Sequence, residues 1–227
     1  MLSDQLHKKR TMNLMNNILV SPLLVEIKEY GEIRDCIDIQ WANFLNACEL
    51  SPIIVQTNTP IHFYENLCKI NGLLLIGGGN LSCISKNDPC SIIRDEKEEQ
   101  LIQMALLNDI PIFGICRGLQ FIAHYFGMSL TSCEDHVKKF HPLNINKNKH
   151  FPSLRDKKIL TNSYHEYCIK EINNDFSTVA YVKHNYVIEA IEHKEKKIAG
   201  IMWHPERNDV FSSYDIELFK NFFNKKL

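Results

Sequence analysis

One stretch constrains the fold of this chain more than any other, and it runs from Ile110 to Phe126. It begins as a short apolar run of β type, turns at Gly114-Ile-Cys-Arg-Gly118, and continues with apolar residues at helical spacing. A strand, a tight turn flanked by glycines and a helix make up a nucleophile elbow, here with Cys116 at the corner. A side chain at that corner stands at the positive end of the following helix, where the thiolate form of cysteine is favoured. The stretch therefore predicts a cysteine nucleophile.

The length and composition of the chain are those of one soluble α/β domain. The 227 residues are enough to bury a full core, and 44% of them are hydrophobic and 23% charged. The net charge of −1 gives no overall field that would favour nucleic acid or a membrane surface. We expect a polar, flexible leader over residues 1–17 and a single hydrolase domain over residues 18–227.

The cysteines indicate the compartment. No two of them have Cys-x-x-Cys spacing, which disfavours a zinc site or a redox pair. The sequence also lacks a secretory apolar segment and any stretch that approaches the length of a membrane span. We therefore expect free thiols in a reducing cytoplasm. The eight cysteines are Cys36, Cys48, Cys68, Cys83, Cys90, Cys116, Cys133 and Cys168.

Strands and helices are predicted to alternate in the first half of the chain, which favours a doubly wound parallel sheet. The predicted strands are 17–21, 52–56, 72–76 and 110–115, and the predicted helices are 32–48, 60–69 and 94–108. The third strand ends in Gly77-Gly78-Gly79, where the backbone can approach a ligand and expose its N–H groups. Sites in such sheets lie at the carboxyl ends of strands, so this glycine cluster and Cys116 should meet. The polar loop 82–91 is either a lid over the site or a simple connection.

From Met128 onward the pattern changes to short β segments, predicted at 158–161, 177–183, 187–192 and 198–203. We expect antiparallel hairpins there, along one edge of the sheet. A helix over 215–225, capped by Ser212 or Ser213, closes the chain. Four aromatic residues are expected in the core: Trp41, Phe44, Phe219 and Phe222.

A base for the predicted nucleophile is found in Trp203-His204-Pro205-Glu206, directly after a predicted strand. Pro205 favours an extended backbone at His204, and in extended chain residues two apart face the same side. Glu206 can then hold one ring nitrogen of His204 while the other nitrogen faces Cys116. Taken alone, the tripeptide suits equally well a strand end followed by a solvated acid. Together with the elbow and the glycine cluster, it favours a triad.

These motifs resemble those of the class I glutamine amidotransferase-like superfamily, in which Gly114-Ile-Cys116-Arg-Gly118-Leu-Gln120 and His204-Pro-Glu206 occur in this order. Four segments resemble the γ-glutamyl-γ-aminobutyrate hydrolase branch: Leu74-Leu-Ile-Gly-Gly-Gly79, Arg94-Asp95, Asn162-Ser-Tyr-His165 and Ile188-Glu-Ala-Ile-Glu-His193. Three others look closest to γ-glutamyl-CDP-amidate hydrolases of capsular phosphoramidate synthesis: Ala123-His-Tyr-Phe126, Cys133-Glu-Asp-His136 and Gly200-Ile-Met-Trp-His-Pro-Glu-Arg207. The resemblance runs from about Ile18 to the end and implies a three-layer, flavodoxin-like fold with a mostly parallel sheet.

The resemblance implies a cysteine-dependent hydrolase of γ-glutamyl amides that needs no cofactor. Cys116 matches the nucleophile, which forms a glutamyl thioester, His204 matches the base, and Glu206 matches the orienting acid. The oxyanion hole matches the backbone N–H of Arg117 together with one from Gly78 or Gly79. Positions that hold the α-amino and α-carboxylate groups of the glutamyl moiety match Gln120, Ser163, Tyr164 and His165.

We assign recognition of the leaving group to the basic stretch 136–150, which contains no acidic residue. Its basic residues are His136, Lys138, Lys139, His141, Lys147, Lys149 and His150. A diphosphate would suit this stretch through charge-assisted hydrogen bonds, with His136, Lys138 and Lys139 as the predicted contacts. The alternative is a solvated basic loop. We predict no metal, because no carboxylate or thiolate lies at a convincing spacing from the histidines.

Three functions are weighed. The preferred one is hydrolysis of γ-glutamyl-CDP-amidate to cytidine diphosphoramidate, or of γ-glutamyl-γ-aminobutyrate or another γ-glutamyl amine. The second is a glutaminase subunit that delivers ammonia to a synthase partner. The third is a non-catalytic interaction module, which the intact Cys116, His204 and Glu206 disfavour. The preferred function implies a small-molecule substrate, with no nucleic acid, membrane or obligatory synthase partner; a homodimer is allowed.

Overall fold

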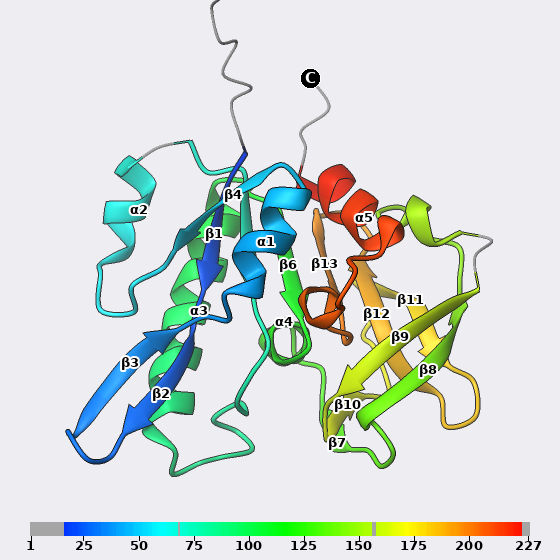
Figure 1. The fold of residues 1–227 in the computed structure, drawn as a ribbon, viewed down its shortest axis with the longest axis horizontal. Coiled ribbons are helices and arrows are strands. Elements are labelled where there is room, and N and C mark those ends of the chain that lie inside the picture. Colours follow the sequence, from blue (N-terminus) through cyan, green and yellow to red (C-terminus); the bar gives the residue numbers. More distant parts are fainter. Residues whose placement is uncertain (1–15, 68, 156–157, 224–227) are drawn as a thin grey trace, which may run out of the picture.

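A computed structural model describes residues 16–67, 69–155 and 158–223. Within these residues one sheet of eleven strands forms the centre of the molecule (Figure 1). Its first half is parallel, and the strands lie side by side in the order β4 (Leu50–Ile54), β1 (Asn16–Ser21), β5 (Gly72–Leu75), β6 (Ile112–Ile115) and β13 (Ile198–Ile201). Counted along the chain, this is the 2-1-3-4-5 order of flavodoxin-like folds. The predicted doubly wound sheet is therefore confirmed.

The second half of the sheet is antiparallel, as predicted for the edge. It continues from β13 through β12 (Val187–His193), β11 (Phe176–Val182), β8 (Val137–Ile145) and β9 (Ile159–Tyr164). Two short strands lie off this path, β7 (Leu130–Ser132) and β10 (Tyr167–Ile169), and β10 pairs with both β7 and β12. Strand β13 joins the two halves, because it is parallel to β6 and antiparallel to β12.

Helices cover both faces of the parallel half (Figure 1). On one face α1 (Gln40–Ala47) and α5 (Ser213–Phe223) bury the four aromatic residues predicted for the core, Trp41, Phe44, Phe219 and Phe222. On the other face α3 (Pro89–Leu107) and α4 (Arg117–Tyr125) form a second apolar core, which Tyr64 of α2 (Ile61–Leu67) joins. Ser212 accepts a hydrogen bond from the Asp215 N–H at 3.3 Å, as expected of the residue that caps α5.

The predicted helix 32–48 is wrong in nearly its first half, because α1 begins only at Gln40. Residues Glu32–Cys36 form β3, which pairs with β2 (Leu23–Ile27) in a two-stranded hairpin. Gly31 turns the hairpin with a φ of +62°. The Asp38 carboxylate then accepts a hydrogen bond from the Gln40 N–H at 2.9 Å, a local bond typical of a helix start. The helix therefore begins only after the hairpin.

The loop predicted over 82–91 is shorter than expected. Helix α3 begins at Pro89, because Asp88 caps it by accepting hydrogen bonds from the N–H groups of Cys90 and Ser91. The Ser91 hydroxyl also donates to the Asn80 carbonyl at 3.0 Å. The last residues of the loop proposed as a lid therefore belong to the first turn of α3.

Two further predictions concern the chain ends and membranes. Residues 16 and 17, expected in the leader, form the start of β1, and residues 1–15 lie outside the described part of the chain. In the described ranges no helix has the length and apolar character needed to cross a membrane.

Candidate active site

Cys116 occupies the turn between β6 and α4, as the elbow predicts. Its backbone has φ +49° and ψ −106°, a strained conformation for a residue with a side chain. Glycines make this turn feasible, because a Cβ at Gly118 would clash with the Leu75 carbonyl oxygen, and one at Gly114 would lie 2.5 Å from the Leu119 nitrogen. The helix can therefore pack directly against strands β5 and β6.

His204 follows β13 and meets Glu206 as predicted, although by a different route. The His204 backbone is extended, but Pro205–Arg207 form a 3₁₀ turn. This turn, and not strand alternation, brings the Glu206 carboxylate to His204 Nδ1 at 2.7 Å. Both residues are almost completely buried. The remaining ring nitrogen can then face a reacting group.

The imidazole of His204 lies next to Cys116 and the glycine cluster. A Cβ at Gly77 would lie 2.5 Å from His204 Cε1 and 3.4 Å from the Cys116 Cβ. Burial lowers the pKa of His204, but the neighbouring Cys116 and the Glu206 carboxylate outweigh burial and raise this pKa to about 9. A protonated imidazole beside the sulfur is thereby favoured near neutral pH.

The glycine cluster is held by Arg94. Gly78 and Gly79 have φ values of +94° and +71°, which glycine adopts without strain. The buried Arg94 guanidinium donates to the carbonyl oxygens of Ile76 at 2.6 Å and Gly78 at 2.7 Å, and it pairs with Glu98 at 2.9 Å. With its carbonyl groups bound in this way, the cluster is fixed beside Cys116.

The side chain of Arg117 is bound away from the predicted oxyanion site. Its guanidinium pairs with Asp95 and Glu98, and Glu98 also accepts a hydrogen bond from Ser21 at 2.7 Å. Arg117 is only 1% exposed. The side chain therefore anchors the start of α4, and the part of Arg117 that can face a substrate at the elbow is its backbone N–H.

Sequence reasoning missed the role of Asn162. Its side-chain amide donates to the His204 carbonyl at 2.7 Å and accepts from the His204 N–H at 2.8 Å. These two bonds fix the backbone of His204 from β9, the last strand of the antiparallel half. Asn162 stands in one of the resembling segments, but no local pattern points to its partner, which lies far along the chain.

Of the residues predicted to bind the glutamyl group, Ser163, Tyr164 and His165 divide between two sides of the β9 segment. The Tyr164 ring meets the His204 ring edge to face at 5.8 Å, and the Arg207 guanidinium lies 4.6 Å from the Tyr164 ring centre. The side chains of Ser163 and His165 are buried on the other side. Gln120, in α4, donates to the Tyr167 carbonyl at 2.8 Å. Tyr164 is thus the member of this set whose side chain contacts His204.

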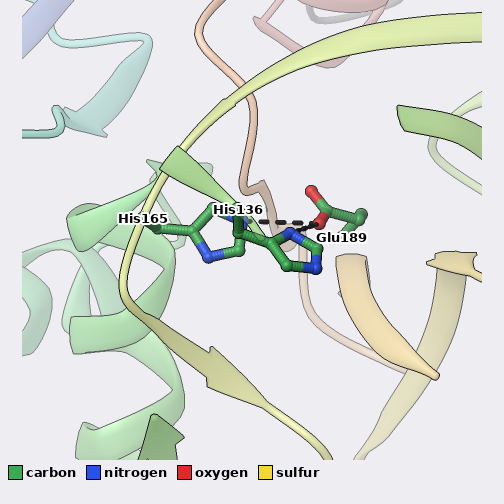
Figure 2. A group of neighbouring side chains, drawn as sticks. All are labelled: His136, His165 and Glu189. Carbon is green, nitrogen blue, oxygen red and sulfur yellow. Dashed lines mark ion pairs between the residues drawn. The ribbon is translucent and has the colours of Figure 1, made fainter. Parts of the chain in front are cut away.

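The basic stretch 136–150 is mostly a strand and not a loop. Lys138 and Lys139 are exposed on β8, and Lys139 pairs with Ser163, next to Tyr164. His136 is completely buried, so its side chain is not on the rim where the sequence prediction placed it. Its ring and that of His165 both pair with the Glu189 carboxylate, at 3.2 Å and 3.4 Å (Figure 2).

A cavity adjoins two of the predicted catalytic residues, His204 and Glu206. It has a volume of about 270 Å³, and its lining includes Gly77, Gly78, His204, Glu206 and Arg207. The β2–β3 hairpin and α1 supply further walls through Leu23, Cys36 and Trp41. The cavity lies at the carboxyl ends of β5 and β13, where doubly wound sheets bind their ligands.

The chain belongs to the Peptidase C26 family, whose model matches residues 24–206. The match places it among hydrolases and confirms the resemblance to class I glutamine amidotransferases. A curated relative that it resembles is the γ-glutamyl-CDP-amidate hydrolase of Campylobacter jejuni, with 33% identity over 198 residues, 86% of this chain and 91% of the relative. A glutamine-hydrolysing GMP synthase subunit of Methanocaldococcus jannaschii is 27% identical, over 76% of this chain and 83% of the relative.

Solved structures share the fold. A GMP synthase subunit from Thermoplasma acidophilum superposes with a TM-score of 0.70 at 22% identity, covering 92% of each chain. A glutamine amidotransferase from Thermotoga maritima gives a TM-score of 0.65 at 19% identity, covering 91% of this chain and 83% of that one. At these identities the likeness extends to the fold alone.

Proposed function

We propose that this protein hydrolyses γ-glutamyl amides with Cys116 as nucleophile, His204 as base and Glu206 as orienting acid. The observation that carries the proposal is the placement of the His204 imidazole, which lies beside Cys116 at the elbow and holds Glu206 at 2.7 Å on its other nitrogen. This is the arrangement of nucleophile, base and orienting group that a covalent hydrolase needs.

The reaction follows from the chemistry of these groups. The Cys116 thiolate attacks the δ-carbonyl carbon of the γ-glutamyl amide, and backbone N–H groups of Arg117 and of Gly78 or Gly79 stabilise the oxyanion. Removing one such donor typically costs about 3 kcal/mol of transition-state stabilisation. His204 gives its proton to the leaving nitrogen, and a glutamyl thioester remains. His204 then takes a proton from water, the resulting hydroxide attacks the thioester, and glutamate leaves.

We take γ-glutamyl-CDP-amidate as the preferred substrate and cytidine diphosphoramidate as the product. The Campylobacter jejuni relative, which bears the name of that hydrolase, supports this choice. Exposed cations near the site also support it: Lys138 and Lys139 on β8, and Arg207 at the cavity, can bind a diphosphate. A γ-glutamyl-γ-aminobutyrate or other γ-glutamyl amine hydrolase is the next choice.

A second candidate is a glutaminase subunit that passes ammonia to a synthase partner, which the similarity to the GMP synthase subunit of Methanocaldococcus jannaschii favours. Glutamate release by the purified chain alone separates the two, with glutamine, γ-glutamyl-γ-aminobutyrate and γ-glutamyl-CDP-amidate as substrates. We expect release without a partner and the highest kcat/KM for γ-glutamyl-CDP-amidate. Release that requires an added synthase and is confined to glutamine would refute the hydrolase proposal.

The diphosphate contacts are tested by charge reversal of Lys138 and Lys139 together. We expect the KM for γ-glutamyl-CDP-amidate to rise at least about tenfold, because two charge-assisted contacts become repulsive. The KM for γ-glutamyl-γ-aminobutyrate, which has no phosphate, should stay nearly constant.

Lys147 and Lys149 provide the matched control, since they are exposed beyond the other end of β8 and their reversal changes the net charge equally. If both double variants affect all substrates alike, the assignment of this strand to the leaving group is wrong.

We also propose a cytoplasmic setting and action on a small molecule without an obligatory protein partner. Seven cysteines of the described residues are free thiols, which suits a reducing compartment. Fractionation of cells that produce the protein at native levels would test the compartment.

A further inference from the structure

The segment Arg94-Asp95 is one of the sequence motifs to which the proposed reaction gives no role, and the structure places it in a buried ion network. This network consists of two arginines and two acids: Arg94, Asp95, Glu98 and Arg117. Their exposed fractions are 3%, 9%, 0% and 1%, in this order. Because positive and negative side chains balance, the network as a whole is neutral, which makes its burial tolerable.

Glu98 lies at the centre of the network, and both of its carboxylate oxygens are bound. Oε1 accepts from Ser21 Oγ at 2.7 Å and from Arg94 Nε at 2.9 Å, and Oε2 accepts from Arg117 Nη1. Burial raises the pKa of Glu98, but the two guanidinium groups outweigh burial and hold this pKa below its ordinary value. The carboxylate is therefore charged, and it holds each arginine by a charge-assisted hydrogen bond.

One arm of the network reaches the glycine cluster through Arg94. While Nε holds Glu98, Nη2 donates to the Ile76 carbonyl at 2.6 Å and Nη1 donates to the Gly78 carbonyl at 2.7 Å. No peptide bond of the described residues is cis, and in a trans peptide unit the N–H and the C=O point in opposite directions. The Gly79 N–H, which shares its peptide unit with the Gly78 carbonyl, therefore points away from Arg94.

The other arm reaches the nucleophile turn through Arg117, the residue directly after Cys116. The Arg117 guanidinium binds Glu98 with one nitrogen and Asp95 with another. Asp95 in turn accepts from the Ser82 N–H at 2.7 Å, in the chain that follows the glycine cluster. The two segments that carry the assigned oxyanion donors are thus bound to the same pair of acids.

Fixing these two segments relative to each other matters for the proposed chemistry. An oxyanion hole stabilises the transition state best when its donors are oriented before the charge develops. Here the donors belong to separate elements, the chain after β5 and the start of α4. Glycine adds no stiffness of its own, because its backbone adopts many conformations. Hydrogen bonds from its carbonyl groups to a buried guanidinium supply that restraint.

We propose that Glu98 is a positioning residue for the oxyanion hole, which holds the two backbone donors in fixed relative positions through Arg94 and Arg117. This role rests on the hydrolase function proposed above and deepens it. Glu98 touches no reacting atom and acts only through the two arginines that it binds.

The turnover of two variants tests this role. Arg94→Lys keeps the positive charge beside Glu98, but a single ammonium group cannot reproduce the fork that binds Glu98 and both carbonyls. Glu98→Gln keeps the shape of the side chain but sets an amide NH₂ group against a guanidinium. We expect kcat for the best γ-glutamyl substrate to fall about 100-fold in each variant, with KM changed less than about threefold, because the oxyanion donors act on the transition state.

Alkylation of Cys116 by iodoacetamide separates positioning from a merely structural role. This reaction displaces iodide from a saturated carbon, so it needs the thiolate but forms no oxyanion. Its rate, followed on the Cys116 peptide by mass spectrometry, should stay within about threefold of the wild type in both variants. The double variant should lose about as much kcat as either single variant, because both substitutions break the same link.

Ser21→Ala is the matched control, because it removes a donor from the same Glu98 oxygen and leaves both arginine links in place. This variant should lose some stability but keep kcat within about threefold of the wild type. Arg94→Lys retains the charge that Glu98 needs, so it decides the proposal even where Glu98→Gln fails to fold.

Wild-type kcat in folded Arg94→Lys would overturn the positioning role. A matching loss of iodoacetamide reactivity would overturn it too, because Cys116 itself would then be displaced. Failure of the proposed function has a different signature, in which the wild type itself releases no glutamate from any γ-glutamyl amide, and the positioning role then falls with it.

Discussion

At the scale of single residues, the site depends on how the environment of His204 offsets its burial. The ring is almost completely enclosed, which alone would lower its pKa and leave it neutral. Cys116 and Glu206 reverse that effect, and Asn162 fixes the backbone so that both contacts persist. A protonated histidine can then donate to the leaving nitrogen at neutral pH.

Glu206→Gln tests this balance through the pH profile. The pKa of His204, about 9 in the folded protein, keeps the ring protonated at neutral pH, and the proton is lost as the pH rises through this value. We expect kcat/KM of the wild type to fall above pH 9, because this pKa is that of the enzyme without substrate. Without the carboxylate the pKa drops, so the alkaline limb should move to lower pH, with kcat reduced more than KM is raised.

The measurement is kcat and KM for one γ-glutamyl amide between pH 6 and pH 10. An alkaline limb at the same pH in both proteins, or an effect on KM alone, would contradict the orienting role of Glu206.

Much of this site could be predicted from the sequence, and the limit is physical. Cys116, His204 and Glu206 stand in short motifs whose backbone geometry is local. Their residue types and spacing were therefore enough to predict them as candidate site residues. Asn162 and Arg94 act through carbonyl and N–H groups of distant segments, and no local pattern encodes such partners. The path from His204 to Glu206 was also mispredicted, because a 3₁₀ turn replaces the extended segment.

At the scale of elements, the site depends on close packing of α4 and the ends of β5, β6 and β13. Any side chain larger than that of glycine at the contact points would prevent this packing. A Cβ at Gly118 would meet the Leu75 carbonyl, and one at Gly200 would lie 2.7 Å from the Gly114 carbonyl. Small residues at these points let α4, β5, β6 and β13 converge on Cys116. Strand β3 escaped prediction because it is exposed along nearly its whole length and so carries no apolar alternation.

Gly77→Ala tests the consequence for the catalytic geometry. The added Cβ would lie 2.5 Å from His204 Cε1, so the imidazole must move away from Cys116. We expect kcat to fall about 100-fold, the effect typical of misplacing a catalytic group by roughly 1 Å. The unfolding transition should remain cooperative.

Gly127→Ala is the control, because its Cβ meets nothing within 4 Å although its φ of +79° strains the backbone. That variant should lose stability, on the order of 1–2 kcal/mol, and retain activity. Full activity in Gly77→Ala would show that the imidazole position is not critical.

At the scale of the whole molecule, the parallel half carries the elbow, and the antiparallel half supplies Asn162 and Tyr164, which contact His204. Strand–helix alternation predicted a parallel arrangement of β1, β4, β5 and β6, because each strand and helix there has its own period. Strand β13 was expected among the antiparallel hairpins, but it lies parallel to β6. The pairings of β8 with β9 and of β12 with β11 were less accessible, since antiparallel partners are fixed by register across the sheet. For the same reason the group of His136, His165 and Glu189 emerged only in three dimensions.

The central claim is covalent catalysis by Cys116 on a γ-glutamyl amide, and mass spectrometry of quenched enzyme tests it most directly. The purified chain is mixed with γ-glutamyl-CDP-amidate and quenched within a turnover, and released glutamate is measured in parallel. We predict one glutamyl group on the peptide that contains Cys116, and neither adduct nor glutamate release in Cys116→Ala. Glutamate release by Cys116→Ala at the wild-type rate would contradict the account.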